Sequence, residues 1–577
     1  MGSLAPARLA LRALPALRSG QPFRRFPGGS TQQGGNRALQ GGEPTPNAHL
    51  ASRAGGLLLA GLLGLLLPGA QATLVVRIGQ NFTGSTLGVD SDARPADANG
   101  AIGPNHFVEL VNGRFAVFDK TSGTRVQTMT DGAFWARAGV TLTGQLRPTD
   151  PRLAFDAATG RWFAASVDVI PGNSSSNRFL LAVSGSNDPT GGWTGFAFAA
   201  DPASGAFGDF PTLGLDANGV YLSANLFASA NTVLGPNLVS VPKADLLATP
   251  PTIERRTMLG VLSGIPPAYT PQPVVTQGAA SSAEVVLAVG DLGTDFRAHR
   301  NLTAYSLVQA AAAGTASLSA GRTILVPAYT SPVNPPQPGG VTTLDNGDAR
   351  FSATVYRVGD LLYATHSTEV NSRAAVQWFT LDARRLVLLQ SGIISDPALD
   401  LFYPSIAANA QGTVVIGCNG CSSNTFVSSL AVVGETVNGF VTFGKLTLLK
   451  AGTATYQSKD STDGTSRWGD YSATSVDPAN PTHFWTIQMC ATGASVWSTQ
   501  ITELIAAPLV LSIRQADTNV LVSWPSAATG SQLQTTASLG ATNAWLPVAP
   551  SPTVVGDQLQ VTVPTGTTPA FFRVVSP

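Results

Sequence analysis

The chain of 577 residues is long enough for three or four ordinary domains, or for one large repeat fold with appendages. Its 34 basic and 34 acidic residues balance, and only 12% of residues are charged, which excludes the concentrated positive face that nucleic-acid binding requires. The 60 Gly and 40 Pro residues favour short strands and frequent turns over long helices.

An apolar segment near the N-terminus, residues 54–67, follows Arg53 and precedes an Ala-Gln-Ala sequence that ends at Ala72. This order is typical of a signal peptide, so we predict cleavage near Ala72 and a secreted protein, extracellular or at the cell surface. A short membrane anchor is the alternative, but the segment is too short to span a bilayer, and we expect no transmembrane span in the mature chain. We assign residues 1–72 to a disordered leader plus signal peptide, and a start codon assigned too far upstream would explain the leader.

A degenerate repeat occupies the middle of the chain. Its clearest copies begin at Asp150, Asp209 and Tyr403. Each has an apolar strand, an Asp or Asn that opens a tight turn, a Gly that ends it, and a second β-rich strand. Asp and Asn bond their own backbone in such turns, and Gly accepts the positive φ that closes them. The markers of seven copies are Ile102, Leu153, Leu213, Val274, Ala353, Ile406 and Thr474.

The second copy shows a complete unit, with strands predicted at residues 152–156, 161–168, 178–184 and 193–199. Four antiparallel strands repeated seven times predict an all-β fold, a seven-bladed β-propeller over residues 73–505. The last unit lacks its outer strand, so we expect residues 73–82 to supply it and close the ring. An array of two-sheet sandwiches is the alternative architecture.

A separate module is predicted over residues 507–577, where apolar and polar residues alternate between turn signals and indicate a small β-sandwich. Trp524-Pro525 and Phe571-Phe572-Arg573 make it resemble the fibronectin type III-like C-terminal modules of secreted bacterial proteins.

Residues 186–193, with Ser186, Asp188, Gly191 and Trp193, resemble the Asp-box of sialidase-type (BNR) propellers. That motif is structural: its Asp caps a β-turn and its Trp packs beneath. Here the Gly stands one place late, Trp193 lacks a preceding Thr, and the motif occurs once. Together with Arg467-Trp-Gly-Asp470 and Gly208-Asp209-Phe-Pro211, it makes the propeller region similar to secreted bacterial sialidase-like proteins. The catalytic residues of sialidases cannot be matched one by one, so none is carried over.

In a propeller, the starts of the inner strands and the ends of the second strands converge on one mouth, where ligands usually enter. We expect cations, carboxylates and aromatic rings to gather there. The set is Arg152, Asp168, Asp209, Asn225, Asp291, Arg350, His366, Glu369, Tyr403, Arg467, Asp470 and Tyr471.

Three of these residues, Arg152, Arg350 and Arg467, stand at comparable positions in three units. Their forked donors suit one carboxylate or sulfate, with Asp168 and Asn225 as further ligand-binding candidates. Pairing of each Arg with an Asp of the next unit is the structural alternative.

The catalytic candidates are Asp209 and Asp470 as acid and base, Tyr403 or Tyr471, and His366 for proton transfer. Turn capping explains the two Asp residues equally well. A buried, hydrogen-bonded state is the structural alternative for His366.

No metal or other cofactor is expected, although Asp90, Asp92, Asp97 and Asn99 offer oxygen atoms of the kind calcium takes. Their spacing departs from the calcium-loop pattern, so we favour a solvated turn. The three cysteines, Cys418, Cys421 and Cys490, lack a fourth zinc ligand nearby. A Cys421–Cys490 disulfide is expected first and buried free thiols second.

The sequence therefore predicts an exported propeller protein that acts as a ligand-binding or surface-interaction scaffold, with a glycan or a cell-surface component as its partner. A sialidase-like or other glycoside hydrolase that uses the Arg, Asp and Tyr residues of the mouth is the second hypothesis.

Overall fold

The computed structural model describes residues 74–577 except 174, 230–231, 263–266, 278–282, 310–314, 341, 459–464, 527, 529, 540–543, 557, 567–569 and 576–577. The predicted leader and its apolar segment lie outside the described residues, so the signal peptide stays a prediction. Among the described residues, no helix is both long and apolar enough to cross a membrane.

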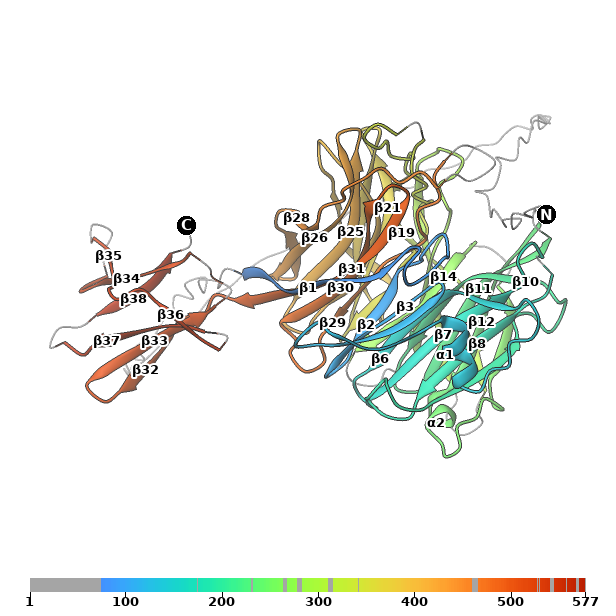
Figure 1. Cartoon of the computed structure of the whole chain (residues 1–577), viewed down its shortest axis with the longest axis horizontal. Coiled ribbons are helices and arrows are strands. Elements are labelled where there is room, and N and C mark those ends of the chain that lie inside the picture. Colours follow the sequence, from blue (N-terminus) through green and yellow to red (C-terminus); the bar gives the residue numbers. More distant parts are fainter. Residues whose placement is uncertain are drawn as a thin grey trace, which may run out of the picture. The chain divides into compact units, whose positions relative to one another are not determined.

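Most of the described chain is β-strand (Figure 1), arranged mainly in antiparallel sheets in which most neighbouring strands are also consecutive in sequence. The middle of the chain is a β-propeller, and we number its units as blades 1 to 7, with the inner strand first. Blade 1 contains β2 (Asn99–Ile102), β3 (His106–Val111), β4 (Arg114–Asp119) and β5 (Arg125–Met129). Blade 2 contains β6 (Arg147–Asp156), β7 (Arg161–Val169), β8 (Arg178–Ser184) and β9 (Trp193–Ala199). Blade 3 contains β10 (Phe207–Leu215), β11 (Gly219–Ser229), β12 (Thr232–Pro242) and β13 (Thr257–Val261).

The remaining blades follow the same order. Blade 4 contains β14 (Tyr269–Pro273), β16 (Glu284–Val289), β17 (His299–Gln309), β18 (Ala316–Leu318) and β19 (Arg322–Tyr329). The short strand β15 (Val275–Gln277) continues the chain after β14 but pairs in parallel with β10 of blade 3 and with β20 (Tyr356–Val358) of blade 5. Blade 5 contains β20 (Tyr356–Val358), β21 (Leu361–Val370), β22 (Arg373–Asp382) and β23 (Val387–Ile394). Blade 6 contains β24 (Asp400–Ala408), β25 (Thr413–Ser422), β26 (Thr425–Val437), β27 (Phe440–Phe443) and β28 (Thr447–Lys450). Blade 7 contains β29 (Ala473–Val476), β30 (His483–Gly493), β31 (Val496–Pro508) and β1 (Leu74–Thr86).

The four strands predicted for the second copy are confirmed as β6 to β9 of blade 2. Two short helices interrupt the pattern. The first, α1 (Asp131–Arg137), follows blade 1 and begins after Thr130, whose hydroxyl accepts the Ala133 amide as an N-cap. The second, α2 (Lys243–Leu246), follows β12.

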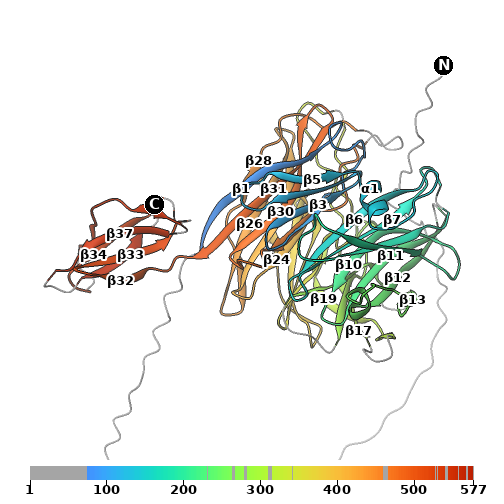
Figure 2. The same cartoon turned by 60° about the horizontal axis from the view of Figure 1, so that its bottom comes forward.

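The ring closes as the sequence predicts. Strand β1 pairs antiparallel with β31, with Leu74 opposite Pro508 and Thr86 opposite Ser498, and the two run side by side in Figures 1 and 2. The first strand of the propeller thus completes its last blade. Seven units joined in this way agree with a seven-bladed propeller, and the array of two-sheet sandwiches is not found in the described residues.

The predicted turns between inner and second strands are also present. In blade 2 the Asp156 carboxylate accepts the amide of Ala158, and Gly160 closes the turn with a φ of 64°. In blade 6 the Asn409 side chain accepts the amide of Gln411 in the same way, and Gly412 has a φ of 87°. These local bonds explain why the repeat is readable from sequence.

The C-terminal module is a small β-sandwich, as predicted. One sheet contains β32 (Ser512–Ala516), β33 (Asn519–Pro525), β37 (Gln558–Pro564) and β36 (Thr553–Val555). The other contains β35 (Leu546–Pro547), β34 (Gln532–Thr536) and β38 (Phe571–Val575). Trp524 is fully buried between them and donates its indole N–H to Ser531 Oγ at 2.8 Å.

The cysteines differ from the first expectation. Cys418, Cys421 and Cys490 are all free and buried, so the Cys421–Cys490 disulfide is wrong and the second alternative, buried thiols, is found. The Cys421 thiol is directed to the Pro336 carbonyl at 3.4 Å. Burial raises the pKa of both the Cys418 and the Cys490 thiol to about 12, so they remain protonated at neutral pH.

The turn at residues 186–193 has the bonds expected of a structural motif. The Asp188 carboxylate accepts the Thr190 amide at 3.0 Å, which fixes the turn. The Trp193 indole N–H donates to the Pro189 carbonyl at 2.9 Å, and its ring packs against Phe134 with centroids 5.1 Å apart. The Ser186 hydroxyl accepts the Asp188 amide.

Candidate functional site at the propeller mouth

Four inner strands carry an irregularity near their start. Pairing with the second strand shifts after Thr149, Asp209, Tyr269 and Phe402. At these shifts, Asp150, Phe210, Thr270 and Tyr403 have φ between 46° and 55°. A positive φ is costly for these residue types, and a bulge re-aims a side chain. The strained backbone positions therefore lie at the starts of the inner strands, which is the end of the propeller axis that the sequence predicts as the mouth.

We call the residues at this position the mouth ring, with one residue from each blade. In blade 1 the equivalent position is Asp97, which has a φ of 49°. In blades 5 and 7 the equivalent positions are Arg350 and Asp470, each two residues before the polar residue of its blade. The full mouth ring is Asp97, Asp150, Phe210, Thr270, Arg350, Tyr403 and Asp470. Two residues further along stands a polar residue in every blade, and this polar ring is Asn99, Arg152, Thr212, Gln272, Ser352, Ser405 and Ser472.

The polar ring joins the blades around the axis. The Thr212 hydroxyl donates to the Pro271 carbonyl of blade 4 at 2.7 Å, and the Gln272 amide donates to the Phe351 carbonyl of blade 5 at 2.7 Å. Asn99 of blade 1 accepts the Leu153 amide of blade 2 at 2.9 Å. These bonds hold the inner strands in a fixed arrangement, so the mouth ring is presented on a rigid support.

Arg152 is the member of the polar ring with the longest reach. Its Nε donates to the Pro211 carbonyl of blade 3 at 2.8 Å, and its Nη1 donates to the Ser352 carbonyl of blade 5 at 2.9 Å. Its guanidinium carbon lies 3.6 Å from the ring centroid of Tyr471 in blade 7 and 5.1 Å from that of Phe210. One side chain from blade 2 thus contacts three other blades across the axis.

The other two predicted Arg residues are already paired. Arg350 makes a bidentate contact with Asp348, at 2.8 Å from Nε and 2.6 Å from Nη2. Arg467 contacts Asp345 at 3.0 Å and Asp470 at 2.6 Å. Both guanidinium groups are therefore paired with Asp, but the partners are not Asp residues of the next unit as the structural alternative expected: Asp348 and Asp470 are local, and Asp345 precedes blade 5. An anionic ligand would have to displace carboxylates to reach either guanidinium group.

Carboxyl groups outnumber guanidinium groups at the mouth, and this raises their pKa values. Burial, followed by the neighbouring charges of Asp150 and Asp470, raises the pKa of Asp209 to about 8. Burial and Asp470 raise the pKa values of Asp97 and Asp150 in the same direction. These carboxyls interact with one another, so they titrate as a set, and part of the set stays protonated at neutral pH.

Four buried polar atoms of the mouth lack a hydrogen-bond partner among the described residues. They are Asp97 Oδ1, Arg152 Nη2, Tyr403 Oη and Tyr471 Oη. All four residues are buried, and their charges act on one another. Buried polar groups are normally satisfied, so four open groups in one place indicate a position for a polar ligand or bound solvent.

The structure thus brings together seven of the predicted mouth residues, namely Arg152, Arg350, Arg467, Asp209, Asp470, Tyr403 and Tyr471. Two other candidates lie in supporting roles. Asp168 is buried and accepts the backbone N–H and the Nε–H of Arg178 in its own blade. Asn225 bonds to the amide and hydroxyl of Thr270, a mouth-ring residue.

His366 takes the structural alternative given above. It is fully buried between Tyr329, Phe351 and Phe379, and its Nδ1 lies 2.6 Å from the Ala349 carbonyl. Burial lowers its pKa to about 4, so the ring stays neutral at physiological pH. A proton-transfer role would require a solvent path that its burial does not offer.

The oxygen-rich loop that contains Asp90 and Asp97, expected to be a solvated turn, is divided in the structure. Asp90 pairs with Arg125 at 2.6 Å, whereas Asp97 is buried in the mouth ring and accepts the Asn112 side-chain amide at 2.7 Å. The expected solvated turn is therefore wrong for Asp97, because Asn112 holds its carboxyl inside.

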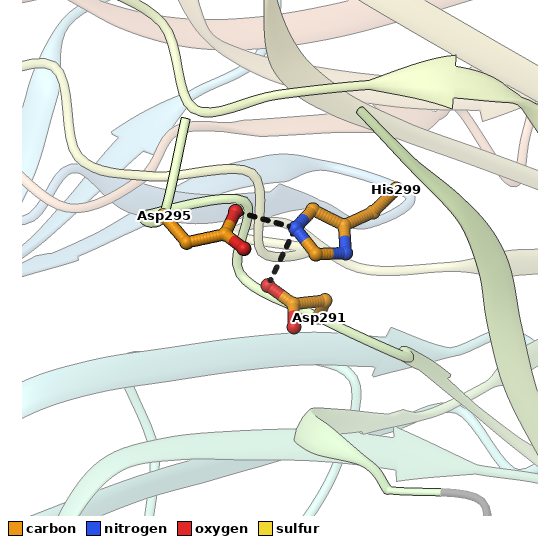
Figure 3. A group of neighbouring side chains, drawn as sticks. All are labelled: Asp291, Asp295 and His299. Carbon is orange, nitrogen blue, oxygen red and sulfur yellow. Dashed lines mark hydrogen bonds and ion pairs between the residues drawn. The ribbon is translucent and has the colours of Figure 1, made fainter. Parts of the chain in front are cut away.

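A second carboxylate group lies in blade 4 (Figure 3). His299 Nε2 is 2.7 Å from Asp295 Oδ1 and 3.4 Å from Asp291 Oδ1, and these atoms are close enough to share a metal ion. Both carboxylates also accept backbone amides, from Gly293 and Arg297, so they are explained as turn caps. We assign no ion to this group.

Several mouth residues were not predicted, namely Asp150, Phe210, Asp345 and Asp348. A signal for part of the set is present in the sequence. In four copies the mouth-ring residue is followed by Pro and then by a polar residue, as in Asp150-Pro-Arg152 and Tyr403-Pro-Ser405. This shared triplet marks the bulge, although the outcome of the bulge, a side chain turned to the axis, needs the structure.

No protein-family model matches the chain, and no curated protein matches it. Among solved structures, Drosophila Semaphorin 1b (extracellular domains 1–2) is similar with a TM-score of 0.34 and 8% identity over 75% of this chain and 87% of that chain. The Dos1 propeller is similar with a TM-score of 0.33 and 10% sequence identity, over 70% of this chain and 75% of that chain. A protein of unknown function from Dyadobacter fermentans is similar with a TM-score of 0.34 and 11% sequence identity, over 64% of this chain and 97% of that chain. The propeller architecture rests on the strand pairing of this chain, and these structures carry no function to it.

Proposed function

We propose that this protein is an exported binding scaffold whose propeller mouth holds a hydroxyl-rich ligand, a glycan or a related component of the cell envelope. The observation that carries the proposal is the set of four open polar atoms at the mouth. It combines three donors, on Arg152, Tyr403 and Tyr471, with one carboxyl oxygen of Asp97. Sugar hydroxyls both donate and accept, and such a mixed set suits them better than a purely anionic group.

Two further features support a glycan over a carboxylate ligand. The rings of Phe210 and Tyr471, with centroids 5.5 Å apart, stand beside the open atoms and offer apolar surface to a sugar face. The Arg350 and Arg467 forks are occupied by Asp348, Asp345 and Asp470. A sialic-acid carboxylate therefore meets no free pair of guanidinium groups there.

Export is part of the proposal. Strand β1 begins at Leu74, two residues beyond the expected cleavage site at Ala72. Removal of the leader at that site would leave the closing strand complete. Sequencing the N-terminus of protein recovered from the culture medium tests this point, and a mature chain that begins beyond Leu74 would contradict it.

Binding is tested by presenting the full chain to a glycan array and to envelope fractions, followed by titration of any hit. Tyr403→Phe and Tyr471→Phe each remove one open hydroxyl and keep the ring, so each should weaken binding by about tenfold. Tyr305→Phe in blade 4 is the matched control and should bind as the wild type does. The absence of saturable binding, or wild-type affinity in both mouth variants, would contradict the proposal.

A glycoside hydrolase is the second candidate, favoured by one observation. Asp209 has a pKa of about 8 and is therefore protonated at neutral pH, as a general acid must be. Release of a chromogenic group from glycosides, lost in Asp209→Asn and Asp470→Asn, would support hydrolysis. Activity that survives both substitutions would exclude these residues as the acid and base.

A further inference from the structure

The end of the axis opposite the mouth contains a pocket of about 260 Å³. It lies where the inner strands run into their turns, and its walls are mostly apolar. All seven blades contribute to the walls, through Ala101, Ala154, Leu215, Val275, Tyr356, Asn409 and Val476 among others. Along β6, Arg152 stands between this pocket and the mouth residue Asp150, so the two ends are separate sites.

Two of the turns at this end pair their carboxylate with a lysine from the next blade. Asp156 of blade 2 lies 2.7 Å from Lys243, which follows the third strand of blade 3, and both side chains are buried. Asp477 of blade 7 lies 2.7 Å from Lys120, which follows the third strand of blade 1. The same construction thus neutralises a buried carboxylate at two seams between blades.

Asp216 occupies the same turn position in blade 3 but has no lysine. Its Oδ1 accepts the amides of Asn218 and Gly219 and the hydroxyl of Tyr221. Its Oδ2 is buried and has no hydrogen-bond partner among the described residues, and the residue is only 1% exposed. The third strand of blade 4 ends at Gln309, and the next five residues are Ala and Gly, so the sequence places no cation there.

Of the three turn carboxylates that line the pocket, Asp216 is therefore the one without an ion-pair partner among the described residues. Asp156 and Asp477 are balanced by their lysines, whereas Asp216 is not. Glu284 stands nearby, and its pKa is raised by burial and then by the charge of Asp216. A buried carboxylate that has no cation and one oxygen without a hydrogen bond is unfavourable in an apolar pocket, and a bound cation would relieve it.

We propose that this pocket binds a small organic cation, an ammonium group on a compact apolar body, with Asp216 as its counter-ion. The volume admits a ligand of several heavy atoms, and the apolar walls favour a ligand that carries its own hydrocarbon surface. The ring of Tyr356 in the wall offers a further contact to an ammonium group. Calcium or magnesium would need six or more oxygen ligands, which these walls do not supply.

The test uses the full chain and two probes of the same shape. Choline carries a quaternary ammonium group, and 3,3-dimethyl-1-butanol replaces its nitrogen with carbon. Isothermal titration should show saturable binding of choline and at least about tenfold weaker binding of the alcohol. Asp216→Asn should weaken choline binding by a similar factor, since it removes the charge and keeps the turn oxygen.

The chain offers matched controls. Asn409 caps the equivalent turn of blade 6, so Asn is compatible with this turn and Asp216→Asn is expected to fold. If its melting curve shows otherwise, Ala217→Phe at the exposed rim provides a second variant, which should block choline by filling the entrance. Tyr403→Phe at the mouth should leave choline binding unchanged, which separates this site from the proposed glycan site.

Three results would overturn the proposal. They are no saturable choline binding below about 100 mM, equal affinity for the neutral alcohol, and equal affinity of the wild type and Asp216→Asn. Displacement of choline by calcium chloride at low millimolar concentration would assign the pocket to an inorganic cation and would also overturn it.

Discussion

At the mouth, Asp470 interacts with Arg152, Arg350 and Arg467 at once, whereas at the opposite end Asp156 has Lys243 as its own partner. Mouth charges are therefore shared across blades, and a change at one residue alters the protonation of the others. Charges at the opposite end form separate pairs between adjacent blades. The comparison teaches that a propeller with similar blades can build an adjustable electrostatic site at one end of its axis and fixed seams at the other.

The largest effect is expected from Arg152, which lies between the two ends. Arg152→Ala removes the bonds to the Pro211 and Ser352 carbonyls and the contact with the Tyr471 ring. We expect the free energy of unfolding to fall by about 5 kcal/mol, measured by urea denaturation. Arg384→Ala, at an exposed position, is the control and should change it by less than about 0.5 kcal/mol. A loss of the same small size in both variants would show that Arg152 does not join the blades.

Breaking one seam should have the next largest effect. Lys243→Met keeps the apolar length of the side chain but leaves Asp156 buried without a cation, which should cost about 3 kcal/mol of unfolding free energy. Adding Asp156→Asn should recover most of the loss, since Asn caps this kind of turn in blade 6. A double-mutant cycle measured by chemical denaturation gives the coupling, and a coupling near zero would place the pair among ordinary surface contacts.

The stability contributed by the mouth should depend on pH. The folded pKa of Asp209, about 8, lies above its ordinary value of 3.8, so the folded state binds the extra proton. Its contribution to stability is therefore present at low pH and is lost as pH rises from about 4 to 8. Because Asp209 is only partly screened from solvent, we expect Asp209→Asn to be more stable than wild type by about 1–2 kcal/mol at pH 8 and nearly equal at pH 5. Urea denaturation at both pH values measures this, and a pH-independent difference would contradict it.

The smallest effect compares two buried tyrosine hydroxyls. Tyr403 Oη at the mouth makes no hydrogen bond in the described structure, whereas the Tyr221 hydroxyl donates to Asp216 at 2.9 Å. Tyr403→Phe should leave the melting temperature unchanged or slightly raised, while Tyr221→Phe should cost about 1 kcal/mol. If Tyr403→Phe is the more damaging of the two, then its hydroxyl is satisfied by bound solvent and is not open to a ligand.

Much of the fold is predictable because each blade repeats local chemistry. The Asp or Asn that caps its own turn, and the Gly that ends it, act within a few residues of sequence, so β6 to β9 and the turns at Asp156 and Asn409 follow from pattern alone. The closing strand is also predictable, since the last blade lacks an outer strand and β1 is the unpaired segment that fits.

The site is predictable only in part, for a physical reason. Register placed Arg152, Arg350 and Arg467 at one end, but their partners depend on contacts between distant segments, such as Arg152 with Ser352. The same holds for Asp97, which the sequence assigns to a solvated turn: it is buried in the mouth ring because the side chain of Asn112, 15 residues away, donates to its carboxyl. Neither contact leaves a periodic signal.

The pairing of β1 with β31 has a consequence for the order in which the protein is assembled. Thr83 bonds to Gln500, which lies 417 positions later in the sequence, so the first strand of the propeller must wait for a partner that is synthesised much later. Such a long-range contact forms late in folding. Until then the edge of β31 is unpaired. A chaperone that prevents aggregation of the emerging chain would have to protect that edge until β1 pairs with it.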